Sequence, residues 1–228
     1  MFLSRIQLNP ARRTGRPLLT SPHALHAAVL AAFPDPSPRD TGRVLWRLDA
    51  EPHRTHLYIV SPEPPDLTHI AEQAGWPTRE DSWQVRPYAP LLERVENDHR
   101  YLFRLTANPV RSERLPGGTR GKVYGHVTVR QQEQWLLDRQ ERLGIHIDLL
   151  GPDEVETGPD ADPAHALLVK DRRTLSFTRR ETAVTLRVAT YEGRLIVTDR
   201  DRFVHALGHG IGRAKGYGCG LMTIAPVR

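Results

Sequence analysis

Residues 2–33, FLSRIQLNPARRTGRPLLTSPHALHAAVLAAF, contain the strand and helix with which the predicted fold begins. Apolar and polar residues alternate over 2–8, which predicts a strand. Ser21 suits a helix N-cap and Pro22 suits the first helical position, so a helix is expected to run to about Phe33, before the proline-rich stretch 34–38. The intervening residues, with Arg12, Arg13 and Arg16, form a predicted basic loop.

Working outward, the remaining elements follow in a repeated order. Residues 44–48 and 57–60 read as strands, 64–75 contain a short helix and 83–86 read as a fourth strand. A second round begins with a strand at 100–107 and an amphipathic helix at 129–143. It continues with a hairpin at 166–180 that turns near Asp171, and with a strand pair, 182–189 and 195–198, around Glu192-Gly193. It ends with a helix at 199–209 capped by Asp199 and a strand at 219–226.

The order strand, helix, strand, strand, helix, strand therefore occurs twice. This pattern predicts an α+β protein of two tandem ferredoxin-like (RRM-like) βαββαβ domains, residues 1–92 and 97–228. The acidic, Gly/Pro-rich stretch 151–163 is expected to be a surface loop.

Composition excludes several classes of protein. With 39% hydrophobic and 26% charged residues among 228, the chain can form a packed core. The single cysteine, Cys219, excludes an internal disulfide and a multi-cysteine zinc site. No apolar run is long enough to span a bilayer and the N-terminus does not resemble a signal peptide, so a cytoplasmic protein with no membrane partner is expected.

Positive charge is concentrated toward the C-terminus. Residues 164–228 carry 12 Lys or Arg and 5 Asp or Glu, whereas 1–95 are nearly balanced. The excess of Arg over Lys, 29 to 3, fits a GC-rich genome, but it does not explain the shortage of acids near the C-terminus. The distribution favours a polyanionic partner.

The stretch GIGRAKGYGCG, residues 210–220, contains two cations, Arg213 and Lys215. Glycine lets the backbone approach a ligand closely, and exposed N–H groups with nearby cations bind anions. No Gly-Lys-Ser/Thr follows, and the next element is a strand, so the loop is neither a Walker loop nor a dinucleotide fingerprint. A flexible connection is the alternative. The five glycines are Gly210, Gly212, Gly216, Gly218 and Gly220.

His23 and His26 lie three residues apart on the first helix and so share one face. Histidine titrates near neutrality and suits proton transfer, such as the attack of an RNA 2′-hydroxyl on the adjacent phosphorus. Two other interpretations remain open: ordinary helix-surface residues, or a metal site, for which the sequence offers no convincing third ligand.

The predicted hairpin at 166–180 is strongly basic. Arginines on a hairpin can follow phosphates or enter a groove of nucleic acid. A charged edge strand that prevents aggregation is the alternative. The cations concerned are Lys170, Arg172, Arg173, Arg179 and Arg180.

Two His-x-Thr triplets, at His53 and at His126, give a further alternative. One such motif in each half is typical of 2H phosphoesterases, although His53 stands in the polar run EPHRTH rather than in an apolar strand.

Four segments together resemble the CRISPR-associated repeat-RNA endoribonucleases, in particular the CasE family of the type I-E system. FLSRIQLNPARR is similar to the family's first strand and basic loop, and SPHALHAAV to its catalytic helix. YEGRLIVTD is similar to its late strand pair, and GIGRAKGYGCGLMTIAP to its glycine-rich C-terminal motif. The resemblance covers nearly the whole chain.

The resemblance implies that His26 is catalytic and that His23 stands where some relatives have a tyrosine. It also places Arg179 and Arg180 on a groove-binding hairpin. It implies an endoribonuclease that cuts CRISPR precursor RNA at the base of the repeat stem-loop, without metal or cofactor. The products carry a 2′,3′-cyclic phosphate and a 5′-hydroxyl. The free enzyme is expected to be a monomer that keeps its RNA and joins other Cascade subunits. A non-catalytic RNA-binding subunit and a 2H phosphoesterase are the alternatives.

Overall fold

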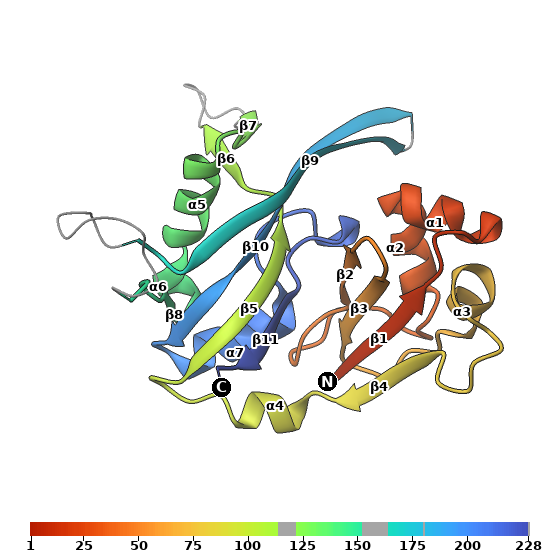
Figure 1. The fold of residues 1–228 in the computed structure, drawn as a ribbon, viewed down its shortest axis with the longest axis horizontal. Helices are drawn as coiled ribbons and strands as arrows, with labels where there is room; N and C mark the ends of the chain where they lie inside the picture. Colours follow the sequence, from red (N-terminus) through yellow and green to blue (C-terminus); the bar gives the residue numbers. More distant parts are fainter. Residues whose placement is uncertain (114–121, 152–163, 180, 228) are drawn as a thin grey trace.

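The computed structural model describes residues 1–113, 122–151, 164–179 and 181–227. The first half of the chain forms a four-stranded sheet with its helices (Figure 1). Its elements are β1 (Phe2–Leu8), η1 (Arg13–Gly15), α1 (Arg16–Thr20), α2 (Pro22–Leu30), β2 (Leu45–Ala50), β3 (Thr55–Ser61), α3 (Thr68–Ala74), β4 (Trp83–Pro87) and α4 (Ala89–Glu93).

The second half forms a larger sheet and a separate two-stranded hairpin, β6–β7. Its elements are β5 (Arg100–Ala107), β6 (Val110–Glu113), β7 (Lys122–Gly125), α5 (Val129–Leu137), α6 (Gln140–Leu143), β8 (Ile145–Ile147), β9 (Leu167–Arg179), β10 (Thr182–Val197), α7 (Arg200–His209), η3 (Lys215–Tyr217) and β11 (Met222–Pro226).

Both sheets have the strand order of a ferredoxin-like fold. The first is ordered β2-β3-β1-β4 and the second β11-β5-β10-β8, with antiparallel neighbours in each. In both, the first and third strands of the unit lie at the centre. The prediction of an α+β protein with two tandem ferredoxin-like units is therefore confirmed.

The two halves share part of their core. One cluster of buried side chains, including Ile6, Leu25 and Leu57, lies between the first sheet and its helices. The other lies around the second sheet and also takes in Leu45 and Val60 of the first. The contact between the halves is thus part of the hydrophobic core, and it fixes their relative position.

Several helix boundaries differ from the prediction. The Ser21 cap is confirmed, because its Oγ accepts a hydrogen bond from the N–H of Ala24 (3.2 Å), but α2 ends at Leu30 rather than at Phe33. The basic loop before it contains two short helices, η1 and α1. The helix predicted at 129–143 is broken into α5 and α6. At the break, the Arg139 guanidinium donates to the carbonyl of Trp135 (2.6 Å) and caps the end of α5.

The predicted hairpin at 166–180 and the predicted strand pair at 182–198 are both wrong. Residues 167–179 and 182–197 are two long continuous strands that pair with each other, and Glu181 lies in a turn between them. Asp171, expected at a turn, has a positive φ of 49° and sits at a register shift opposite Val188–Thr190, so it marks a bulge. Gly193 is not a turn residue either: a Cβ there would collide with the carbonyl oxygen of Ala166, the residue before β9.

The Asp199 cap of α7 is confirmed, because its side chain accepts from the N–H of Arg202 (3.0 Å). The acidic loop predicted at 151–163 lies outside the described residues, apart from Gly151. Every helix in the described ranges is too short or too polar to cross a lipid bilayer.

Candidate active site

His26 lies on α2 and faces the loop of residues 210–220, here called the glycine-rich loop. The indole N–H of Trp46 donates a hydrogen bond to Nδ1 of His26 (3.2 Å), and the two rings stack with their planes 26° apart. Because Nδ1 accepts this bond, the neutral ring carries its proton on Nε2. Nε2 faces the loop, since a Cβ added at Gly216 would lie 3.1 Å from it.

Local structure explains why these two rings meet. Leu25 and Val29 point from α2 into the first core, which leaves His26 half-buried at the helix margin nearest β2. Side chains alternate along β2, so Trp46 faces α2 while Leu45 enters the other core cluster. Trp46 was not predicted as a site residue from the sequence. Its position on the helix-facing side of β2 becomes evident only once the pairing of β2 with β3 is known.

The glycines of the loop allow close packing between the halves. Gly218 has a φ of 78°, and a Cβ there would lie 2.7 Å from the Trp46 ring. A Cβ on Gly212 would lie 3.0 Å from the ring of Trp135. A side chain at either position would displace an aromatic ring, so the loop's glycines support the placement of Trp46 and, through it, of His26.

The two loop cations have different surroundings. The Lys215 ammonium donates to the carbonyl of Gly212 (2.9 Å), and burial, followed by the charges of Arg43 and Arg142, lowers its pKa. This hydrogen bond links two positions of the glycine-rich loop, so Lys215 stabilises the conformation of the loop. Arg213 is exposed and donates to Ser112 Oγ (3.2 Å) on β6.

The end of the β9–β10 hairpin reaches the same place. Phe177 packs against Tyr217 of the glycine-rich loop, with ring centroids 4.7 Å apart. A pocket of about 160 Å³ is lined by Trp46, Tyr217 and Arg173, among others, and Trp46 is the residue that hydrogen-bonds to His26. The structure therefore gathers a histidine, two aromatic rings and an arginine from four separate elements.

The other predicted RNA-binding cations are spread more widely. Lys170 forms an ion pair with Glu192 (3.0 Å). Arg172 donates to Gln132 (2.9 Å) and to the carbonyl of Val127, which attaches β9 to α5. Arg12 donates weakly to the carbonyl of Gly75 (3.4 Å), and Arg13 is exposed. The side chain of Arg179 and all of Arg180 lie outside the described residues.

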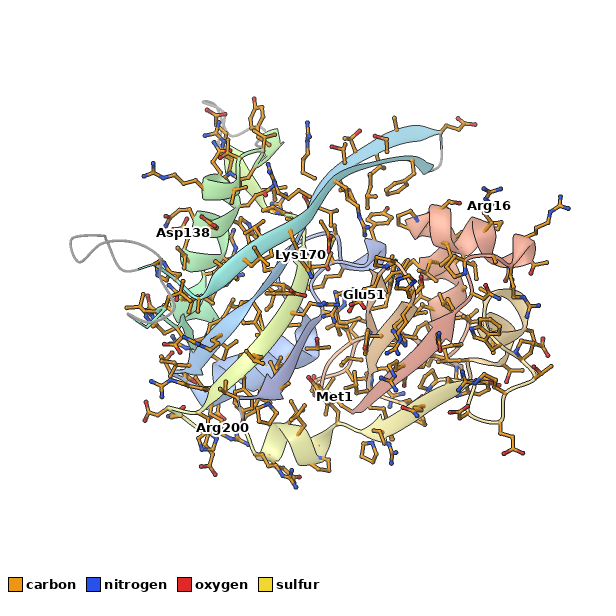
Figure 2. All side chains as sticks on the ribbon, in the orientation of Figure 1. Met1, Arg16, Glu51, Asp138, Lys170 and Arg200 are labelled. Atoms are coloured by element: carbon orange, nitrogen blue, oxygen red, sulfur yellow. The ribbon has the colours of Figure 1, made fainter. Side chains whose placement is uncertain are left out.

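A buried arginine joins the two halves beneath this surface. Arg47, 2% exposed, pairs with Asp49 through two hydrogen bonds and donates to carbonyls of Arg104 and Leu221 and to Thr223 Oγ1 in the second half. Burial alone would raise the pKa of Asp49, but its bonds to Arg47 and Arg104 outweigh this and lower it. Figure 2 labels Glu51 in the first half and Lys170 in the second, on either side of the contact between the two halves.

The remaining candidate histidines do not join His26. His23 is exposed one turn earlier on α2. His53 is exposed in the turn between β2 and β3, whereas His126 lines a different pocket, next to α5. The hydroxyl of Thr128 caps α5 by accepting from the N–H of Gln131, so it is not paired with His126 for catalysis. In the described ranges, no three His, Cys, Asp or Glu side chains cluster as metal ligands.

Replacement of Trp46 by phenylalanine is expected to slow RNA cleavage about 2- to 10-fold, since it removes one hydrogen bond to His26 and retains most of the packing. Single-turnover rates measure the effect. Trp83→Phe is the matched control, because Trp83 packs against the same core. Equal rates for Trp46→Phe and wild type would show that the bond does not position His26.

Comparison with known proteins agrees with this arrangement. The family model described as "CRISPR associated protein" matches residues 1–226. CRISPR-associated endoribonuclease Cse3 of Thermus thermophilus is 30% identical to this chain over an alignment of 228 positions. The alignment covers 99% of this chain and all of the relative. The Cascade subunit CasE of Escherichia coli is 24% identical, with both chains covered completely.

A solved structure of Cse3 bound to a 19-nucleotide RNA superimposes with a TM-score of 0.74 at 26% identity, covering 99% of this chain and all of that one. The alignment thus includes both sheets and the glycine-rich loop. Because the family model and the 30% identical relative each cover almost the whole chain, the protein belongs to the CRISPR associated protein family.

Proposed function

We propose that this protein is an endoribonuclease that cleaves CRISPR precursor RNA at the base of the repeat stem-loop. The observation that carries the proposal is the placement of His26, held by Trp46 with its Nε2 toward the glycine-rich loop. The relatives Cse3 and CasE support it, since one is a CRISPR-associated endoribonuclease and the other a Cascade subunit.

The reaction uses the nucleophile of the RNA. The 2′-oxygen forms a bond to the adjacent phosphorus, the bond from phosphorus to the 5′-oxygen breaks, and the products are a 2′,3′-cyclic phosphate and a 5′-hydroxyl. One group takes the 2′-hydroxyl proton and another gives a proton to the leaving oxygen. Nε2 of His26 faces the glycine-rich loop, so His26 is the proposed group for one of these two proton transfers, and His23 is the candidate for the other.

Charge that develops on the phosphoryl oxygens needs a nearby cation. Arg173 is the proposed cation, because it lines the same pocket as Trp46, the hydrogen-bond partner of His26. The reaction as written needs no metal and no cofactor. The 2H alternative lacks such an arrangement, since His53 and His126 lie at separate places.

The basic β9–β10 hairpin is the proposed path of the RNA stem. Replacing Arg179 and Arg180 together with alanine is expected to weaken binding and to reduce the slope of log K against log salt by about 1.4–1.8, as two phosphate contacts are lost. Fluorescence anisotropy over a salt series measures this. Arg86→Ala with Arg94→Ala removes the same charge elsewhere, and an equal effect of both pairs would contradict a specific role for the hairpin.

We further propose that the chain, divided into domains at about 92–97, is a cytoplasmic monomer when free. It then keeps its cleaved RNA and joins other Cascade subunits. The relative named as a Cascade subunit supports this assembly.

The test is incubation of end-labelled repeat RNA with the pure protein in EDTA, followed by analysis of the product ends. The expected result is one cut with a cyclic phosphate and a 5′-hydroxyl. RNA that is bound but intact after long incubation would favour the non-catalytic RNA-binding alternative. Activity lost in His53→Ala and His126→Ala but kept in His26→Ala would favour the 2H alternative.

A further inference from the structure

A second pocket lies on the other side of the glycine-rich loop from His26. It has a volume of about 660 Å³ and is enclosed by β6, α5, α6 and the loop residues Gly212 and Arg213. Asp138, which follows the last residue of α5, marks this side of the molecule in Figure 2. Neither the catalytic arrangement nor the basic hairpin accounts for this pocket.

The pocket is positively charged. Four arginines line it, and Asp138 is the one acid among its lining residues. Burial, followed by the charges of Arg111 and Arg139, lowers the pKa of His126 in the same wall. Arginine is suited to phosphate because its planar guanidinium donates two parallel hydrogen bonds. The four are Arg111, Arg139, Arg142 and Arg213.

Two polar groups buried in the wall are unsatisfied. Within the described residues, Nε1 of Trp135 and Oδ1 of Asn108 have no hydrogen-bond partner, although these residues are only 2% and 6% exposed. Buried polar groups in native proteins are almost always paired, so a water molecule, an ion or a bound ligand can supply the partner of each of these two atoms. One is a donor and the other an acceptor, which is the complement that the edge of a nucleobase offers.

We propose that this pocket holds one unpaired nucleotide of the bound RNA, with its phosphate on Arg111 and Arg142 and its base edge on Trp135 and Asn108. The inference rests on the proposed function. A base within a duplex uses its Watson–Crick edge for pairing, so the nucleotide must come from a single-stranded part of the RNA. Gly212 and Gly216 are four residues apart and at most about 14 Å, so one RNA strand can reach both this pocket and His26.

The test compares the affinities of two RNAs: the repeat with its single-stranded flanks, and the stem-loop alone. Trp135→Phe removes the indole N–H, which has no described protein partner, and retains an aromatic ring. It should weaken binding of the flanked RNA about 2- to 12-fold, the effect of one hydrogen bond, and leave the stem-loop unaffected. Arg142→Ala should act in the same selective way. Arg130→Ala is the control, since Arg130 is exposed on α5 outside the pocket lining.

Wild-type affinity of Trp135→Phe for flanked RNA would overturn the proposal, and so would an equal loss on both RNAs. A titration of wild type and Trp135→Phe with the four nucleoside 5′-monophosphates separates this proposal from the function on which it rests. If wild type binds neither RNA but binds a nucleotide more tightly than Trp135→Phe does, the proposed function fails and the assignment of a nucleotide to the pocket stands. If wild type binds no RNA and no nucleotide, the proposed function and the nucleotide pocket both fail.

Discussion

Replacement of His26 by alanine is expected to slow single-turnover cleavage of repeat RNA by about 10²- to 10⁴-fold, the contribution typical of one group that transfers a proton. RNA affinity should stay unchanged, since His26 is proposed to transfer a proton rather than to hold the RNA. Cleavage under enzyme excess, with affinity measured separately, separates the two effects.

His146→Ala is the matched control, because His146 is exposed on β8 in the second half and belongs to neither pocket wall. His23→Ala reports on the second group proposed for proton transfer. If His26→Ala cuts at the wild-type rate, the assignment of His26 is wrong, whatever the other variants do.

Replacement of Arg47 by alanine is expected to lower the free energy of unfolding by about 3–5 kcal/mol. It leaves the buried carboxylate of Asp49 with less compensation and removes the donors to two carbonyls in the second half. Urea unfolding measures the change, with Arg5→Ala on the exposed face of β1 as control. If Arg47→Ala lowered the free energy of unfolding no more than Arg5→Ala does, Arg47 would not be the residue that holds the two halves together.

The same pair predicts a dependence on pH. The pKa of Asp49 is lower in the folded protein than its ordinary value of 3.8, so its contribution to stability is complete above about pH 4. That contribution is lost as the pH falls through the lower, folded value. Stability of wild type should therefore fall steeply in acid, and Asp49→Asn should flatten this fall. If the stability of Asp49→Asn fell in acid as steeply as that of wild type, the Asp49 carboxylate would not be the cause of the fall.

Local patterns were sufficient for most of the fold. The alternation over residues 2–8 and the caps at Ser21 and Asp199 predicted elements that the structure contains, because each depends on neighbours along the chain. The long strands β9 and β10 were not predictable in this way. Asp171 and Gly193 are typical of turns, but here one forms a bulge and the other allows close approach of a neighbouring strand, which only strand pairing determines.

The site was predictable in part. Histidine spacing and glycine content predicted site roles for His26 and for the glycine-rich loop, and the structure places the two in contact. Trp46 and the pocket beside α5 were missed, since both depend on contacts between residues far apart in sequence. The cations were predicted by charge alone, and the structure shows that Lys170, Arg172 and Lys215 are already bonded to protein groups.

The central claim is that this protein cuts RNA through the RNA's own 2′-hydroxyl. The most direct measurement maps the cut in all-ribose repeat RNA and then repeats the assay, in EDTA, with a single 2′-deoxynucleotide on the 5′ side of that cut. The deoxy-substituted RNA is predicted to bind as before and to remain intact at that site. Cleavage there at the all-ribose rate would contradict the account.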